Sequence, residues 1–263
     1  MGIKYKINPN FFKSWSPNMA YVLGFIAADG SLQDTPYMRG QYISIWSNDI
    51  EILRKIKVVL DSEHTIVTIK PREFVFRGKI YISKEQYKLR IGSHEIYNDL
   101  LNLGITPRKS NTINFPEVPN EFMAHFLRGY LDGDGCISIY NKKQRLSVIF
   151  TSGSEDFLWR LSEVISLTLK IKRHNVFSNH WAFQVKYSTK EAIPLLKYCY
   201  SGIEDGLYLE RKYNKFLDFF GLYPKWQKYN GVVPKRSREL SAKQLFTGSS
   251  PVHALNFAEQ LYS

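Results

Sequence analysis

The sequence predicts an α+β protein made of two similar halves, each with helices packed against a sheet. Three observations predict this class. One ordered set of segments occurs twice, amphipathic helical segments alternate with strand-like segments, and the strand-like segments alternate polar and apolar residues, as in RLSVIF and WAFQVKY. Such alternation indicates that one face of each sheet is exposed. Each half reads helix, two strands, helix, two strands, helix.

The first helix of each half contains the clearest match between the two copies. AYVLGFIAADGSL (20–32) aligns with HFLRGYLDGDGCI (125–137), and Asp29 and Asp134 are 105 residues apart. Similarity that continues in the same order over such a length indicates a duplicated structural unit.

Both first helices have a recognisable start. Ser16 is a favourable N-cap residue and Pro17 suits the first helical position. We expect Pro119-Asn120 to open the second copy in the same manner.

Strand and helix segments follow in the same order in both halves. YISIWSNDIEILRKIKVVL (42–60) resembles LSVIFTSGSEDFLWRLSEVISL (146–167), each a strand, a polar turn and an amphipathic helix. YKLRIGSHEIYNDLLNLGI (87–105) resembles WAFQVKYSTKEAIPLLKYC (181–199), again a strand and a helix. We expect strands near 31–46, 66–91, 136–151 and 169–187.

The repeats define the expected domains. NTINFPEVPN (111–120), with two prolines, is the natural linker between them. We predict an N-terminal half over 1–115, a C-terminal half over 116–223 and a basic tail over 224–263. In the tail, Lys235, Arg236 and Arg238 are candidates for phosphate contacts.

Composition excludes several classes of protein. With 263 residues, 44% hydrophobic and 23% charged, the chain can bury a core and does not read as disordered. It contains no apolar run of about 18 residues, so we expect no membrane span, and no secretion signal is recognisable. Two cysteines give neither a disulfide framework nor a zinc pattern. We expect an intracellular location, with bacterial or archaeal cytoplasm and an organelle both open.

The net charge points to a polyanionic partner. The formal charge is +12, the isoelectric point is about 9.5 and aromatic residues make up 15% of the chain. Nucleic acid is the default partner for such a folded chain. The alternative is a solvated basic surface that only maintains solubility.

The two aspartates that end the repeated helices are electrostatically misplaced. A helix C-terminus carries partial negative charge, which disfavours a carboxylate there. Small residues on one face of each helix would let the two helices approach closely, so Asp29 and Asp134 would lie side by side and repel each other. Divalent cations with oxygen ligands would remove that cost. A single DGDG is more often only a turn, and only the paired occurrence favours a site.

The pair VLGFIAADG (22–30) and LRGYLDGDG (127–135) resembles the LAGLIDADG signature of homing endonucleases, and the resemblance covers about residues 15–222. It implies a monomer of two αββαββα halves, with a saddle-shaped pair of antiparallel sheets lying on double-stranded DNA. It also implies metal-dependent hydrolysis of both DNA strands and a role in intron homing.

The resemblance assigns the site as well. Asp29 and Asp134 would bind Mg²⁺ or Mn²⁺, with Ala28 and Gly133 completing the metal site. A basic residue is also implied near each scissile phosphate, where it would stabilise developing negative charge. Lys109 and Lys212, each placed before the last helix of its half, are the candidates. The alternative is that both are ordinary surface lysines.

Two positions depart from the family pattern. The sixth motif position is Asp132 in the second copy but Ala27 in the first. Because the eighth position is acidic in both copies, this difference does not argue for an inactive protein. The second motif position is Arg128 rather than a small residue, and we expect it at the outer rim of the helix pair.

Polar and basic residues on the exposed strands are the candidates for DNA contact. Arg and Lys can read guanine and Asn and Gln can read adenine, while other contacts reach only phosphates. The first-half candidates are Gln33, Arg39, Gln41, Lys70, Arg72, Arg77, Lys79, Lys88 and Arg90. The second-half candidates are Tyr140, Asn141, Lys143, Arg145, Lys172, Arg173, His174, Asn179, Gln184 and Lys186.

The two sheets set the expected target. Strands of about nine residues span about 30 Å, so two halves end to end would cover about 60 Å. That length corresponds to about 18 base pairs. The halves differ in sequence, so the target should be asymmetric.

A site-specific DNA endonuclease is the leading hypothesis. An intron RNA-splicing maturase, which would bind intron RNA, is the near alternative. A non-catalytic DNA-binding regulator on the same fold is a third, although it should have lost the acids. Cleavage of duplex DNA in the presence of Mg²⁺ would separate them.

Overall fold

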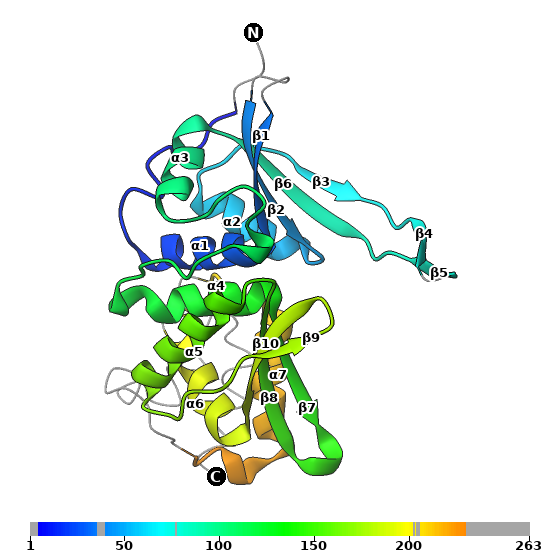
Figure 1. Ribbon diagram of the computed structural model, residues 1–263, viewed down its shortest axis with the longest axis vertical. Coiled ribbons are helices and arrows are strands. Elements are labelled where there is room, and N and C mark those ends of the chain that lie inside the picture. The colour runs from blue at the N-terminus through cyan, green and yellow to red at the C-terminus, as the bar shows by residue number, and fades with distance from the viewer. Residues whose placement is uncertain (1–4, 36–39, 77, 202, 204–205, 230–263) are drawn as a thin grey trace.

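The computed structural model describes residues 5–35, 40–76, 78–201, 203 and 206–229. These residues form two α+β halves stacked along the long axis of the molecule (Figure 1). The predicted fold class is confirmed, because each half begins with a helix and continues with two strands, a second helix, further strands and a third helix.

Both halves follow this order with small differences in length. The first half contains α1 (Pro17–Asp29), β1 (Gly30–Thr35), β2 (Gly40–Ser47), α2 (Ile50–Val59), β3 (Ile66–Ile69), β4 (Glu73–Phe76), β5 (Lys79–Ile82), β6 (Gln86–Gly92) and α3 (His94–Asn102). The second half contains α4 (Met123–Asp134), β7 (Gly135–Tyr140), β8 (Arg145–Ser152), α5 (Glu155–Leu169), β9 (Phe177–Asn179), β10 (Ala182–Ser188), α6 (Thr189–Cys199) and α7 (Glu210–Leu222). Short 3₁₀ turns add η2 (Lys109–Asn111), η3 (Asn120–Phe122), η4 (Asn141–Lys143) and η6 (Pro224–Trp226).

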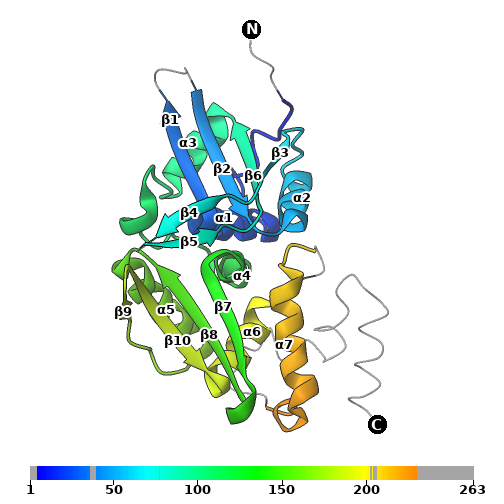
Figure 2. The ribbon, with the colours of Figure 1, turned by 90° about the vertical axis from the view of Figure 1, so that its right-hand side faces the viewer.

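The two four-stranded antiparallel sheets have the same arrangement. Their strand orders are β1-β2-β6-β3 and β7-β8-β10-β9. Their registers also correspond, because Gly30 pairs with Ile45 and Gly135 pairs with Phe150 at equivalent points just after α1 and α4. Figure 2 shows one sheet above the other, with α1 and α4 between the halves. The sequence repeat is therefore a repeat in space.

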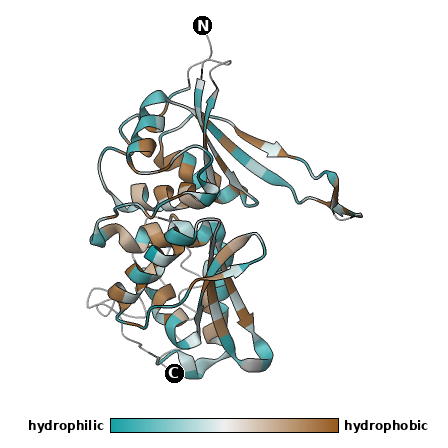
Figure 3. Cartoon of the chain, viewed as in Figure 1, coloured by the Kyte–Doolittle hydropathy of each residue, from teal (hydrophilic) through white to brown (hydrophobic). Residues whose placement is uncertain are grey.

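One face of each sheet packs on helices and the other, hereafter the open face, does not. Val185 and Tyr187 of β10 are buried, whereas Lys186 and Ser188 between and beyond them are exposed. Hydrophilic and hydrophobic bands accordingly alternate along the strands (Figure 3). This is the alternation expected of a sheet that buries one face.

The closest contact between the halves is the backbone approach of α1 and α4. A Cβ atom built on Gly24 would lie 2.2 Å from the carbonyl oxygen of Phe126. One built on Gly129 would lie 2.0 Å from the carbonyl oxygen of Tyr21. The two glycines thus contact each other's helix reciprocally, and every residue of α1 from Met19 to Ala27 is buried. Only residues without a side chain allow helices to pack this closely.

Helix starts agree with the sequence in the first half only. The Oγ atom of Ser16 accepts a hydrogen bond of 3.1 Å from the N–H of Met19, as expected of an N-cap. The expectation for Pro119-Asn120 is wrong, because Asn120 begins the 3₁₀ turn η3 and α4 begins only at Met123, without a side-chain cap. Burial of α4 between the halves stabilises it in place of a cap.

Two strand regions also differ from expectation. Residues 171–176 form no strand, so only 177–179 and 182–188 of the region 169–187 are extended. The region 66–91 contains four strands, because β4 and β5 form a separate two-stranded ribbon beyond the sheet. The domain boundaries remain a prediction.

The predicted tail lies mostly outside the described residues, as do Lys235, Arg236 and Arg238. Its first residues are ordered parts of the fold, since Trp226 and Tyr229 pack against the core and Lys197 donates to the carbonyl of Tyr229 at 3.1 Å. No helix in the described part of the chain is both long and apolar enough to cross a membrane.

The glycine contact generates a stability prediction. Gly129→Ala should lower the free energy of unfolding by about 3 kcal/mol or more, because overpacking commonly costs about 1–3 kcal/mol and here the obstructing atoms are backbone. Urea denaturation measures the loss. Gly92→Ala is the matched control, since its Cβ would meet the Tyr42 ring at an ordinary 3.4 Å. Equal stability losses in the two variants would contradict the close helix contact.

Candidate active site

The paired helices end in the two predicted acids. Asp29 is the last residue of α1 and Asp134 the last of α4, and a strand begins at the next residue in each case. A Cβ built on Gly133 would lie 2.4 Å from the Cβ of Ala28 and 3.4 Å from the Oδ2 of Asp29, so the two helix ends touch. The structure thus brings together the acids that the sequence repeat pairs. Asp29 is half-buried and Asp134 remains exposed to solvent.

Holding the acids together costs electrostatic free energy. Burial, and then the Asp134 carboxylate, raise the pKa of Asp29 to about 6. Although Asp134 as a whole keeps part of its surface exposed, the protein atoms packed around its carboxylate raise its pKa, and the ammonium groups of Lys109 and Lys212 oppose that shift. A raised pKa means that the ionised form is disfavoured without a cation nearby. Burial therefore disfavours the ionised forms of both acids more than the nearby ammonium groups favour them.

Two buried lysines neutralise the helix ends that carry the acids. The Nζ atom of Lys109 donates to the carbonyls of Ala27 and Ala28, at 2.6 and 3.2 Å. Both lysines are 5% exposed, so neither is an ordinary surface lysine. A cation on the last carbonyls of a helix is favourable because it offsets the helix dipole.

Lys212 makes the larger set of contacts. Its Nζ donates to the carbonyls of Leu131 at 2.6 Å, Asp132 at 2.7 Å, Gly133 at 3.2 Å and Gly135 at 2.7 Å. Burial lowers its pKa to about 8, against the attraction of the nearby acids, and burial likewise lowers the pKa of Lys109. The three protons of the Lys212 ammonium group are thus shared among four carbonyl oxygens.

The placement of these lysines in the chain differs from expectation. Lys212 lies inside α7 rather than before the last helix, and Lys109 lies in a 3₁₀ turn. The role of either lysine near a phosphate remains a prediction. The carbonyls of Ala28 and Gly133, expected in the metal site, each accept a bond of 3.2 Å from one of these lysines.

The sequence suggested that Arg128 lies at the outer rim of the helix pair, but the structure places it elsewhere. It is 1% exposed, and its guanidinium donates to the carbonyls of Cys199 at 2.8 Å and Leu207 at 2.9 Å. Asp132 is also buried, at 2% exposure, and its carboxylate accepts hydrogen bonds of 2.8 Å from the hydroxyl of Tyr21 and the N–H of Leu209. A sequence signal existed, since Arg and Asp stand four residues apart where the first copy has Leu23 and Ala27.

The open face of the first half presents cations stacked on aromatic rings. The Nζ of Lys88 lies 4.6 Å from the ring centroid of Trp46, and the guanidinium of Arg90 lies 3.8 Å from that of Tyr42. All four residues alternate with buried positions on β2 and β6. Stacking holds the two cations in place on the sheet.

The open face of the second half carries other side chains at the equivalent positions. Gln184 donates to the Oγ1 of Thr151 at 3.3 Å, and Lys186 lies 5.5 Å from the ring centroid of Tyr140. The registers place Gln184 opposite Thr151 on the neighbouring strand, as Lys88 lies opposite Trp46 in the first half. Equivalent positions therefore carry different chemistry in the two halves.

Most DNA-contact candidates are accessible to a partner, but several are not on the open face. Those on or beside the open strands, the ribbon or the turns are Gln33, Lys70, Arg72, Lys79, Lys88, Arg90, Tyr140, Asn141, Arg145, Asn179, Gln184 and Lys186. Arg39, Arg77 and the side chain of Lys143 lie outside the described residues.

Four candidates lie elsewhere, for physical reasons. Gln41 is on the helical side of β2, where its side chain contacts the ring of His94 at the start of α3. Lys172, Arg173 and His174 lie in the irregular segment 171–176. The Arg173 guanidinium lies 4.9 Å from the ring centroid of Trp159 on α5, and His174 packs on Tyr187, so both face the helical side of the sheet.

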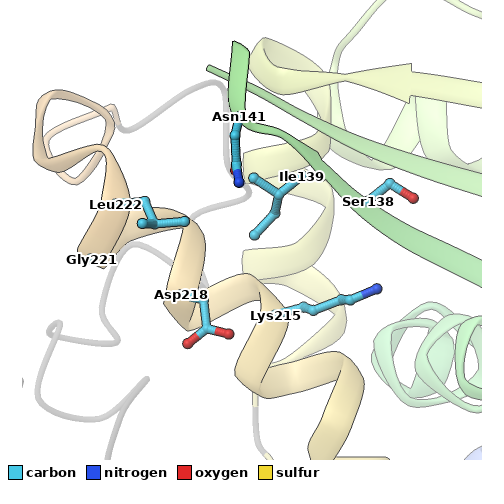
Figure 4. Close-up of a pocket in the computed structure, with 7 residues that line it drawn as sticks. All are labelled: Ser138, Ile139, Asn141, Lys215, Asp218, Gly221 and Leu222. Carbon is cyan, nitrogen blue, oxygen red and sulfur yellow. The ribbon is translucent and has the colours of Figure 1, made fainter. Parts of the chain in front are cut away.

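A groove of about 610 Å³ lies between β7 and α7. Its lining includes Ile139 and Asn141 of the strand side and Leu222 of the helix, which face one another in Figure 4. Lys215 also lines the groove, and its Nζ donates to the carbonyl of Ile137 at 3.2 Å. The groove begins several residues beyond Asp134 along β7 and does not include either helix-terminal acid.

The donor set at the helix ends suits a hard divalent cation. Among the described residues no cluster of three or more His, Cys, Asp and Glu side chains occurs, so a closed protein cage is not formed there. Mg²⁺ usually takes one or two carboxylates and completes its shell with water and phosphate oxygens. Two carboxylates that repel each other, one of them exposed to solvent, fit that requirement.

Comparison with known proteins gives one family and one fold. Residues 121–176 match the family model of the LAGLIDADG-like domain. The homing endonuclease I-WcaI bound to its DNA recognition sequence is 13% identical, with a TM-score of 0.52 over 79% of this chain and 90% of that chain. The homing endonuclease I-GzeII in complex with its DNA target is 14% identical, with a TM-score of 0.51 over 90% and 99%.

A third solved structure agrees. The meganuclease I-SmaMI bound to uncleaveable DNA is 13% identical, with a TM-score of 0.50 over 86% of this chain and 96% of that chain. At such identities the likeness shows the fold alone. The sequence has no match among the curated proteins searched.

Two similar αβ halves pack through their first helices, α1 and α4, and each of these helices ends in an acid. This arrangement defines a class of pseudo-symmetric two-motif proteins. Residues 121–176 match the LAGLIDADG-like domain, and the fold of the chain is similar to that of the homing endonucleases I-WcaI and I-GzeII.

The raised pKa of Asp29 generates a prediction about pH. The native pKa of about 6 lies above the ordinary aspartate pKa of 3.8, so between these values the native state keeps a proton that the unfolded state has lost. Without divalent cations, stability should therefore fall as the pH rises through this window and stay low above it. Because Asn cannot ionise, Asp29→Asn should be more stable than the wild type by roughly 1–3 kcal/mol at pH 8.

Denaturation at a series of pH values measures this difference, which should vanish below about pH 4. Asp218→Asn, which changes an exposed carboxylate of α7, is the control and should show no gain. The quantity compared is the gain in unfolding free energy of Asp29→Asn over the wild type. The same gain at pH 8 and at pH 4 would rule out the electrostatic cost.

Proposed function

We propose that this protein is a site-specific DNA endonuclease of the homing type, which hydrolyses one phosphodiester in each strand of a long, asymmetric duplex. One observation carries the proposal. Two acids from the two halves meet at the ends of α1 and α4, between two open sheet faces that carry cations. The pseudo-twofold relation between the halves matches the approximate twofold relation between the strands of a duplex.

The chemistry follows from the residues at the helix ends. Asp29 and Asp134 would hold Mg²⁺ or Mn²⁺, which when bound would activate a water and stabilise the leaving oxygen of a phosphodiester. The fixed ammonium groups of Lys109 and Lys212 keep positive charge beside both acids. Positive charge held in place near the phosphate costs no reorganisation as negative charge develops.

The open faces would supply binding and specificity. Their cations would neutralise phosphates, which makes affinity fall steeply with salt. The different chemistry of the two halves supports an asymmetric target. Both halves belong to one chain, and I-WcaI and I-GzeII, whose folds it resembles, are described as bound to DNA targets, which supports a monomer on duplex DNA.

Cleavage of a randomised duplex library by the purified protein in Mg²⁺ tests the proposal. Sequencing of the cut ends should return one long site. Asp29→Asn and Asp134→Asn should each lower the cleavage rate by roughly a hundredfold or more, because each removes a metal ligand. Asp218→Asn should cut like the wild type.

Other outcomes favour other functions. Sequence-specific binding without cutting, unaffected by Asp29→Asn and Asp134→Asn, would make the protein a regulator. Protection of structured intron RNA without cutting of DNA would make it a maturase. Undiminished cleavage in both Asn variants would overturn the site assignment.

Arg90 provides a separate test of recognition. Its guanidinium is held 3.8 Å from the centroid of the Tyr42 ring on the open face, where it would be available for bidentate contact with a guanine. Arg90→Lys should weaken binding by about 1–3 kcal/mol and relax the preference at one position of one half-site. Lys57→Ala, on helix α2 of the helical side, should change neither affinity nor selected sequence. A uniform loss over all sites would instead assign Arg90 to a phosphate.

A further inference from the structure

Asp132 lies in the last turn of α4 but does not face the paired acids. Its Oδ2 accepts a hydrogen bond of 2.8 Å from the hydroxyl of Tyr21 and another of 2.8 Å from the N–H of Leu209. Tyr21 belongs to α1, the motif helix of the other half. One buried carboxylate therefore connects both motif helices with the residue that precedes α7.

The contact with Leu209 fixes the start of the helix that carries Lys212. Leu209 immediately precedes α7, and its carbonyl accepts the N–H of Lys212 at 2.9 Å. The Nζ of Lys212 in turn donates to the carbonyls at the end of α4, including that of Asp132 at 2.7 Å. The end of α4 and the start of α7 thus hold each other through a closed set of buried hydrogen bonds.

Arg128 extends this connection to the segment before α7. Besides the carbonyls of Cys199 and Leu207, it donates to that of Ser201 at 3.3 Å, and its Nη2 contacts the ring of His125 at 3.0 Å. The chain on both sides of the α6–α7 connection is therefore attached to α4. Arg128 is satisfied in this way and so rigidifies the elements that it joins, while the Oδ1 of Asp132 has no hydrogen-bond partner among the described residues.

Among the described residues of the first half, no equivalent connection occurs. Leu23 and Ala27 occupy the positions of Arg128 and Asp132, so no side chain of α1 reaches the backbone near Lys109 in this manner. Lys109 lies in a three-residue turn and reaches two carbonyls. The second half-site is therefore held by more buried contacts than the first.

We propose that Asp132 is a positioning residue that seats Lys212 and Asp134 for cleavage of one of the two strands. This inference rests on the proposed endonuclease function. Each half supplies one acid and one lysine, and the pseudo-twofold axis directs each set to a different strand. Loss of the Asp132 contacts releases the start of α7 and disturbs the second set, while the first set keeps its own contacts.

Asp132→Ala, which copies the residue of the first half, tests the inference on a supercoiled plasmid that carries the selected target. Nicked circles should accumulate, because one strand is cut at least about tenfold more slowly while the other is cut at the wild-type rate. The slowed strand should be the one that Lys212→Met also slows, and KM should not change. Asp132→Asn keeps an acceptor oxygen and should restore most linear product.

Tyr130→Phe is the matched control. It also removes a buried tyrosine hydroxyl from the helix pair, whose 2.8 Å bond goes to the carbonyl of Thr151 rather than to Asp132. It should lower the melting temperature about as much as Tyr21→Phe, but only Tyr21→Phe should increase the nicked fraction. Accumulation of nicked circles in both variants would overturn the inference.

Hydrogen exchange separates this inference from the proposed function. Amides at 209–213 should exchange at least about tenfold faster in Asp132→Ala, while those at 109–113 should not change. A wild-type protein that cuts no DNA would refute the endonuclease function and the strand assignment, whatever the exchange shows. A wild-type protein that cuts, with an Asp132→Ala variant that cuts both strands equally or exchanges normally at 209–213, would refute only the role of Asp132.

Discussion

The contact between α1 and α4 is the constraint on which the rest of the molecule depends. Gly24 and Gly129 each meet a backbone carbonyl of the opposite helix, so the helices approach until their ends touch. This approach places Asp29 beside Asp134 and orients the two sheets that start at the following residues. The electrostatic cost of the paired acids follows from the same contact, and so does the need for compensating cations.

The compensation is built in two parts. Lys109 and Lys212 satisfy the last carbonyls of the motif helices, which offsets the helix dipoles. They do not fully offset the charge of the acids, because burial still raises the pKa values of both. The protein thus tolerates a locally unfavourable arrangement, and such arrangements concentrate at functional sites.

The features that the sequence predicted correctly are those that depend on hydrophobic periodicity and on the internal repeat. The fold class, the start of α1 at Ser16 and the junction of helix and strand after each acid follow from local patterns. It could not place Arg128 and Asp132, since a charged residue in a motif helix suggests exposure, and only the distant carbonyls of the α6–α7 connection explain their burial. It also could not tell the face of Gln41 or find the irregular segment before β9, because both depend on tertiary contacts.

The central claim is that the two helix-terminal acids share divalent cations. Crystals of the protein with its selected DNA site, grown in Mn²⁺ and measured at the manganese edge, test it most directly. The account predicts anomalous peaks within about 2.5 Å of carboxylate oxygens of Asp29 and Asp134. Cut DNA in such crystals with no peak at either carboxylate, or with manganese held only elsewhere, would contradict it.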